Sequence, residues 1–278
     1  MRTAEIGRAE RAAEKILSEL KLDTLPISPF KIAAAKGIHV EPKVSSEPGV
    51  SGFLMRIGDS FGICYASHIK NEGFIHFSIA HEIGHYSLEG HVDAFFSNGN
   101  SIHASRSGFV SDNEYERQAD HFAAALLMPE TLFKKAIQTV GFGFPAIEAL
   151  KNLCKTSITS TAIRYATFTS DPVAVIVSKG KNIDYCFISD ALMQIRGVKR
   201  VPKNTPLPLN GGTMQFNSNQ DQINGGTKVE EASFLNDWFD GAPAIRMKED
   251  IVGLGSYGKT LTVLFTDESI DDEEEIED

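Results

Sequence analysis

Apolar residues recur at helical spacing at the start of the chain. Over residues 3–20 they fall at every third or fourth position with arginine, glutamate and lysine between them, which predicts an amphipathic helix. A second, short helix is expected to begin at Ser28 and Pro29 and to end at Gly37, because serine caps a helix, proline fits its first turn and glycine ends it. The chain is therefore expected to open with two helices.

The periodicity of the apolar residues changes after Gly37. Alternating apolar residues predict three strands, at residues 38–41, 51–57 and 61–66. The Gly-Asp pair at 58–59 favours a tight turn, so we expect the last two strands to form a hairpin in a small antiparallel sheet. An extended peptide can add to such an edge, so residues 51–66 are a candidate substrate-binding edge. Plain scaffold is an equally good interpretation.

Three further segments follow the predicted hairpin. Residues 74–85 are almost entirely apolar and predict a buried helix. Residues 92–112 are rich in serine, asparagine, glycine and aspartate and predict a surface loop. Residues 113–128 are rich in alanine and leucine and stop before Pro129, as expected of a strong helix.

The apolar helix carries the most specific chemistry in the sequence. His81 and His85 lie four residues apart, so their imidazoles leave the same helix face one turn apart and can share one metal ion. Glu82 completes the HExxH pattern, in which two imidazoles hold Zn²⁺ and the glutamate takes a proton from the attacking water. The pattern also occurs by chance on ordinary helices, but a metal ion is the simplest partner for two buried histidines. We predict a zinc site, which Mn²⁺ could also fill in the cell.

A catalytic zinc site needs a third protein ligand, and the sequence offers three candidates. His91 has the spacing seen in metzincins, but the glycine that turns the chain toward the metal in those proteins is two residues late here, at Gly90. Glu116 lies on the next long helix, and Asp120, on the same face, would accept the free ring N–H of a ligand histidine. Glu114 lies on a different face from Asp120 and would lose this coupling.

Two segments of the chain together resemble the signature blocks of the ImmA/IrrE-type metallopeptidases. They are Phe-Ser-Ile-Ala-His-Glu-Ile-Gly-His at 77–85 and Glu-Arg-Gln-Ala-Asp-His-Phe-Ala-Ala-Ala-Leu-Leu-Met-Pro at 116–129. The resemblance implies a gluzincin-like zinc metalloendopeptidase domain over residues 1–135. Within that domain it implies His81 and His85 as zinc ligands, Glu82 as general base and Glu116 as third ligand.

The same resemblance implies that the chain cleaves one specific partner protein rather than proteins in general. The substrate would be a partner repressor of the XRE helix-turn-helix type, and its cleavage would release stress-response or mobile-element genes. The oxyanion-stabilising residue stays open among four candidates: Tyr65, Tyr86, Tyr115 and His103. A zinc-containing DNA-binding regulator and a ligand-sensing module without catalysis are the alternatives. The intact Glu82 argues against both, because a structural zinc needs no proton acceptor beside it.

The second half of the chain predicts a change of architecture. Residues 136–170 suggest a helical linker with a helix-turn-helix outline, but its second helix offers only Arg164 as a cation, so direct DNA binding is not expected. Residues 171–266 predict strands around Gly- and Asn-rich stretches, as in an α/β sensor-like domain weakly similar to GAF or PAS folds. A fold likeness of this kind assigns no ligand. The fold class predicted for the whole chain is α+β.

Composition adds three expectations. The formal net charge is −10, but nine carboxylates lie in residues 267–278, so we expect a disordered acidic tail on a nearly neutral body. No apolar run is long enough to cross a membrane and the N-terminus has no apolar signal core, so a cytoplasmic protein without membrane contact is expected. The three cysteines lack the spacing of a zinc or disulfide framework.

Overall fold

A computed structural model describes residues 4–266, apart from residues 44–49, 68, 70, 98, 100 and 107–112. The predicted acidic tail, 267–278, lies outside the described residues. The chain divides into an N-terminal unit (Met1–Thr139 with Glu148–Arg164) and a C-terminal unit (Val140–Ile147 with Tyr165–Asp278). The boundary falls within helices α7 (Gly143–Cys154) and α8 (Ile158–Phe168). None of the helices among the described residues has both the length and the apolar character needed to cross a bilayer.

The N-terminal unit begins with the two expected helices. Helix α1 (Ala4–Glu19) buries the apolar stripe seen in the sequence, including Ala13 and Leu17. Helix α2 (Pro29–Ala35) is capped by Ser28, whose hydroxyl accepts a hydrogen bond from the backbone N–H of Lys31. Local sequence signals were sufficient for both helices.

The sheet of this unit contains four strands, β1 (His39–Lys43), β2 (Val50–Ile57), β3 (Ser60–Ala66) and β4 (Ile102–Arg106), in the order β1-β3-β2-β4. Strands β2 and β3 form the predicted antiparallel hairpin, but β1 pairs with β3 in parallel. The sheet is therefore mixed, and the prediction of an antiparallel sheet was wrong. Apolar alternation identifies strands, whereas their lateral order depends on pairing between segments distant in the sequence.

Strand β4 overturns two further predictions. It lies within residues 92–112, predicted as a surface loop, and it pairs antiparallel with β2. Helix α4 (His91–Phe96) precedes it. Because β2 lies between β3 and β4, and β3 lies between β1 and β2, the 51–66 hairpin has no free edge, so its prediction as a substrate-binding edge was wrong. The outer strands of this sheet are β1 and β4.

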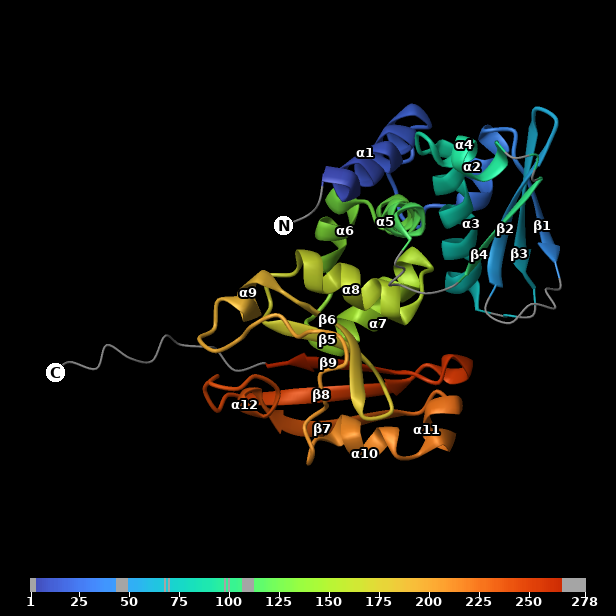
Figure 1. Ribbon diagram of the computed structural model, residues 1–278. Coiled ribbons are helices and arrows are strands. Elements are labelled where there is room, and N and C mark those ends of the chain that lie inside the picture. The colour runs from blue at the N-terminus through green and yellow to red at the C-terminus, as the bar shows by residue number, and fades with distance from the viewer. Residues whose placement is uncertain are drawn as a thin grey trace. The chain divides into compact units, whose positions relative to one another are not determined.

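Helices α3 (Glu72–Ser87), α5 (Glu114–Leu127) and α6 (Glu130–Ile137) complete this unit with α4, the second part of α7 and the first part of α8. Figure 1 shows α3 between α5 and the sheet, and α3 contacts both. Gly84 permits the close approach of the two helices, since a Cβ there would lie 3.0 Å from Cδ1 of Phe122. Asn71 caps α3 and Asn113 caps α5 through their side-chain oxygens. The caps fix where each helix begins and hence which residues face the other helix.

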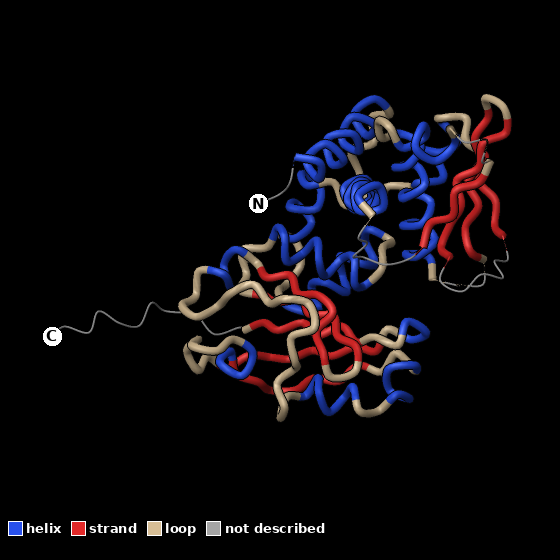
Figure 2. The backbone as a smooth tube through the Cα atoms, viewed as in Figure 1, coloured by secondary structure: helices blue, strands red, loops and turns tan. Residues whose placement is uncertain are grey.

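The C-terminal unit contains a five-stranded antiparallel sheet in the order β6-β5-β9-β8-β7. Figure 2 draws the strands of both sheets in red. Its strands are β5 (Val173–Lys179), β6 (Asn182–Ile188), β7 (Lys228–Phe234), β8 (Arg246–Gly253) and β9 (Thr260–Phe265). The helices are short: α9 (Asp190–Met193), α10 (Gly212–Asn217), α11 (Gln220–Asn224), α12 (Leu235–Trp238) and the 3₁₀ turn η1 (Gly255–Tyr257). Its likeness to GAF or PAS domains stays a prediction, as does the division of the chain into the four predicted segments.

Candidate metal centre

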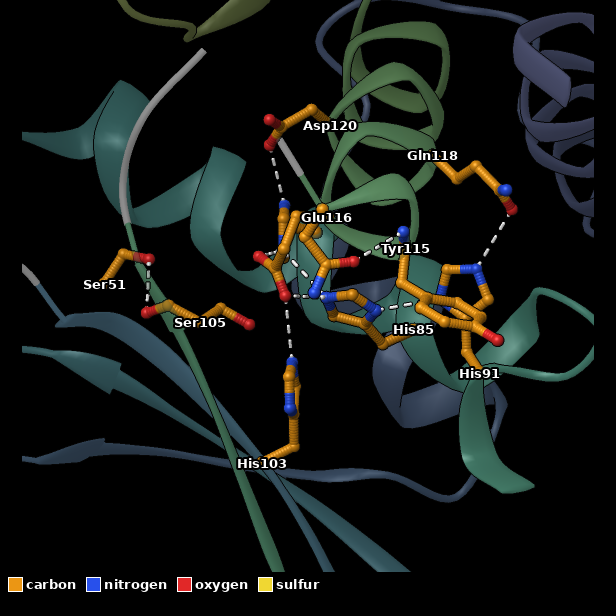
Figure 3. A network of polar contacts seen from close by, with 11 residues as sticks. Ser51, His85, His91, His103, Ser105, Tyr115, Glu116, Gln118 and Asp120 are labelled. Atoms are coloured by element: carbon orange, nitrogen blue, oxygen red, sulfur yellow. Dashed lines mark hydrogen bonds and ion pairs between the residues drawn. The ribbon is translucent and has the colours of Figure 1, made fainter. Parts of the chain in front are cut away.

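Three potential metal ligands converge from two helices. His81 and His85 project from α3 with their Nε2 atoms 2.9 Å apart. Glu116 of α5 places Oε2 3.3 Å from Nε2 of His81 and Oε1 3.4 Å from Nε2 of His85 (Figure 3). The ligand atoms of all three residues lie within 4.8 Å of one another. Two imidazoles and a carboxylate around one small volume are a donor set that Zn²⁺ accepts in catalytic sites.

Glu82 supplies the observation that tests whether a metal site fits here. The side chain is fully buried, and in the described part of the chain no hydrogen bond of normal geometry reaches either carboxylate oxygen. Burial raises the pKa of Glu82 to about 7, although the charge of His81 and the side chain of Ser105 act in the opposite direction. An unpaired buried carboxylate is costly to keep in a stable core. Its presence beside two imidazoles fits a metal site in which it has a proton to accept.

Asp120 orients the first histidine. Its Oδ1 lies 2.8 Å from Nδ1 of His81, so Nδ1–H donates to the carboxylate and Nε2 faces the cluster, where it can bind a cation once it has lost its proton. Burial by itself lowers the pKa of His81, but the hydrogen bonds with Asp120 and Glu116 outweigh it and raise the pKa to about 10. Burial lowers the pKa of His85 to about 3, so this second ring is neutral.

Comparison with known proteins identifies the part of the chain that carries this cluster. Residues 35–141 match the model of the peptidase M78 family, described as IrrE N-terminal-like domain. This segment is an IrrE N-terminal-like domain. His81, His85 and Glu116 all lie inside it, so the resemblance seen in the sequence is confirmed for this part of the chain. No curated protein matches the chain.

A solved structure shares the fold beyond the IrrE-like domain. It is described as "Mycobacterium tuberculosis transcriptional regulator" and is 16% identical, with a TM-score of 0.55. The similarity covers 93% of this chain and 76% of that one. At this identity the likeness concerns the fold alone.

The structure separates the three candidates for the third ligand in the IrrE-like domain. Glu116 lies at the cluster, as described above. Glu114 is exposed on α5 and its Oε1 accepts a hydrogen bond from Nε2 of Gln118. His91 is fully buried, but its Nδ1 lies 2.9 Å from Nδ1 of His85, on the side of that ring away from Nε2. Of the three candidates, only Glu116 has its carboxylate oxygens close to Nε2 of both His81 and His85.

His103 is the one oxyanion candidate found beside the cluster. It lies on β4, its Nε2 is 3.1 Å from Oε1 of Glu116, and its ring stacks on Phe95 with centroids 3.7 Å apart. Burial raises the pKa of Glu116, but the close contacts with His103 and the two α3 histidines hold it well below the usual range. Tyr65 and Tyr86 contact other rings, Phe30 and Phe61. Tyr115 packs on His91, behind the His85 ring, and in the described residues no hydrogen bond joins its side chain to Glu116.

Gly52 of β2 lies beside Glu82, a placement that the sequence did not indicate. A Cβ at this position would lie only 2.7 Å from Oε1 of Glu82, so the absence of a side chain leaves room for the carboxylate. No signal in the sequence alone could have found it, because the contact joins a strand and a helix distant along the chain.

Gly52→Ala should therefore lower peptidase activity about 10- to 100-fold, because small displacements of a reacting group have costs of this size. Unfolding temperature and zinc content should change little, since the flexible carboxylate can move away from the methyl group. Gly62→Ala on β3 is the matched control. A Cβ there meets its nearest atom, Cε of Met55, at an ordinary 3.4 Å. Equal cleavage by Gly52→Ala and Gly62→Ala would show that Glu82 needs no such space.

The raised pKa of His81 makes zinc binding pH-dependent. At pH 7 the metal-free ring carries a proton, because its pKa of about 10 lies above the pH, and a ligand imidazole must be neutral. Zinc should therefore release about one proton and bind about tenfold more tightly for each unit of rising pH between 6 and 8. Calorimetry in buffers of different ionisation enthalpy measures the released proton. An affinity that is constant over this range would contradict the assignment.

Proposed function

We propose that the chain is a zinc-dependent endopeptidase, with His81, His85 and Glu116 as metal ligands and Glu82 as general base. The convergence of the two imidazoles and the carboxylate of Glu116, beside the fully buried Glu82, carries this proposal. The IrrE-like domain supports it, because the peptidase M78 match includes all four residues. We take zinc as the metal, with manganese as the alternative in the cell.

The chemistry follows from the environment of each residue. Zn²⁺ held there would polarise the scissile carbonyl and lower the pKa of a bound water to about 7. Glu82, buried beside the two imidazoles, is placed to accept a proton from the attacking water and to return it to the leaving amine. Asp120 holds the His81 ring in the orientation that presents Nε2. His103, beside Glu116, is the residue we assign to stabilise the developing oxyanion.

We place the substrate chain along β4. Among the residues that the structure describes, this strand is an outer strand of the sheet that pairs with β2 alone, and it carries His103. An extended peptide that adds to an outer strand gains main-chain hydrogen bonds and is held in one direction past the neighbouring site. A peptide bound there would pass the proposed ligands on α3 and α5.

We propose as substrate a partner repressor of the XRE helix-turn-helix type, cleaved in the cytoplasm to release stress-response or mobile-element genes. The support is the IrrE-like domain and, more weakly, a structural neighbour described as a transcriptional regulator. We do not assign direct DNA binding to the helical segment around α8. Its Arg164 is buried and donates to the carbonyl of Met128 and to Oε1 of Glu10, so it is committed inside the protein.

The test of the proposed function is cleavage of a repressor. The full chain is co-expressed with a helix-turn-helix repressor encoded next to it, and the repressor is followed by mass spectrometry with and without a zinc chelator. We expect one defined cut that the chelator prevents and added zinc restores. A repressor that stays intact at all zinc concentrations, or a cut that the chelator leaves unchanged, would rule out the assignment.

A second candidate function is a regulator that keeps zinc without catalysis. The structural neighbour favours it, because that protein is described as a transcriptional regulator. This candidate predicts that Glu82→Gln leaves the regulatory effect on the target genes intact. The endopeptidase predicts that the same variant loses that effect.

A further inference from the structure

A line of hydrogen bonds leads away from the second histidine of the cluster. Nδ1 of His85 lies 2.9 Å from Nδ1 of His91, and Nε2 of His91 lies 3.2 Å from Oε1 of Gln118. Nε2 of Gln118 donates to Oε1 of Glu114 at 2.9 Å. Both rings are fully buried, and Glu114 is exposed. Figure 3 shows His91 between the His85 ring and the Gln118 amide.

The groups along this line of hydrogen bonds, from Glu114 to His85, permit only one placement of the protons on the two rings. The carboxylate of Glu114 only accepts, so Gln118 must turn its NH₂ group toward it and its oxygen toward His91. His91 then carries its proton on Nε2 and presents a bare Nδ1. His85 can donate to that atom only from Nδ1–H, which leaves its Nε2 without a proton. Nε2 is the atom that lies beside Glu116 and His81.

The reversed arrangement would block the metal site. If His91 carried its proton on Nδ1, it would donate to Nδ1 of His85, and the neutral His85 would then hold its proton on Nε2. A cation could bind only after that proton had moved. The direction of the hydrogen bonds therefore decides whether the second ligand is ready to bind.

We propose that His91 is a positioning residue that fixes the ring orientation and the tautomer of His85, with Gln118 fixing those of His91. The packing of the ring supports this role, since Tyr115 meets it edge-on at a centroid distance of 4.9 Å and an angle of 88°. The two proposed ligand histidines are thus oriented by different chemistry: a carboxylate, Asp120, for His81, and a neutral imidazole for His85. The inference rests on the proposed function only in that the cluster binds a metal.

The test is zinc affinity of the full chain, measured by competition with a chromophoric chelator. His91→Phe keeps a ring but removes the acceptor, and we expect zinc to bind about 10- to 100-fold more weakly, the usual effect of losing such a partner. His91→Asn keeps an acceptor close to the position of Nδ1 and should restore affinity to within about threefold of the original chain. Gln118→Leu should weaken binding by less than His91→Phe.

Two outcomes of this series would overturn the inference. Unchanged affinity in His91→Phe would show that His85 needs no acceptor. Loss of zinc from His91→Asn as complete as from His85→Ala would make His91 a ligand. If the original chain binds no zinc, the proposed function fails instead, so the two failures are distinct.

If His91→Phe fails to fold, nitrogen-15 NMR of the unsubstituted, zinc-loaded chain shows directly which ring nitrogens of His85 and His91 carry protons. We expect the proton of His85 on Nδ1 and that of His91 on Nε2. A proton on Nδ1 of His91 would contradict the inference.

Discussion

Replacing Glu82 with glutamine should abolish cleavage of the substrate while leaving zinc bound. Glutamine has the same shape but cannot accept a proton, and general bases contribute about 10²- to 10⁴-fold to rate. Glu82 itself is not one of the three converging ligand residues, so its replacement leaves the ligand set intact. We therefore expect turnover to fall by at least about 100-fold at unchanged zinc content, measured by mass spectrometry of substrate and metal in the same samples.

Glu72→Gln is the matched control for this experiment. Glu72 lies on the same helix, but its side chain is 59% exposed and pairs with Lys155. Its replacement should leave cleavage unchanged. Cleavage by Glu82→Gln within tenfold of the control would remove the general base from the proposed mechanism.

Removing the carboxylate of Glu116 should have the second large effect, the loss of the metal itself. The Ala variant leaves two imidazoles on one helix face with no ligand from α5. We expect zinc affinity to fall more than about 100-fold, beyond the range typical of residues that only orient a ligand. Equilibrium dialysis against buffered zinc measures this directly.

Glu114→Ala separates the two candidate glutamates of α5. Glu114 is exposed and contacts the cluster only through Gln118 and His91, so its replacement should keep one zinc per chain. Binding should weaken by at most about tenfold. Full zinc occupancy in Glu116→Ala, or loss of zinc in Glu114→Ala, would reverse the assignment.

Local periodicity was sufficient to place helices α1, α3 and α5 and the residues on their faces, but not α4, which lies largely within the predicted loop. The i, i+4 spacing in α3 set His81 and His85 side by side, and the same spacing in α5 aligned Glu116 with Asp120. These relations depend on the geometry of one helix, which the sequence specifies directly. The meeting of the two helices came from family resemblance, and the small residue at Gly84 explains how they approach.

Relations between distant segments could not be predicted in the same way. The β4 segment has the composition of a loop because serine and asparagine surround it, yet pairing with β2 makes it a strand and delivers His103 to the cluster. The parallel pairing of β1 and the space that Gly52 leaves for Glu82 are also properties of assembled strands. No window of sequence contains both partners of such a contact.

His91 shows how spacing alone can mislead. Its distance from the HExxH histidines suggested a ligand, but the path of the chain decides which side of the site it reaches. Helix α3 ends at Ser87, Leu88 is extended, and Gly90 adopts a left-handed conformation with φ 82°. That turn brings His91 to Nδ1 of His85 rather than to Nε2.

X-ray absorption at the zinc edge of the loaded chain measures the ligand set itself. We expect two imidazole nitrogens and additional oxygen ligands at about 2.0–2.1 Å, with no sulfur at about 2.3 Å. The scattering from these ligands should be lost in Glu116→Ala, because that variant is expected not to hold zinc. A third imidazole, or a spectrum that is identical in Glu116→Ala, would contradict a centre built from His81, His85 and Glu116.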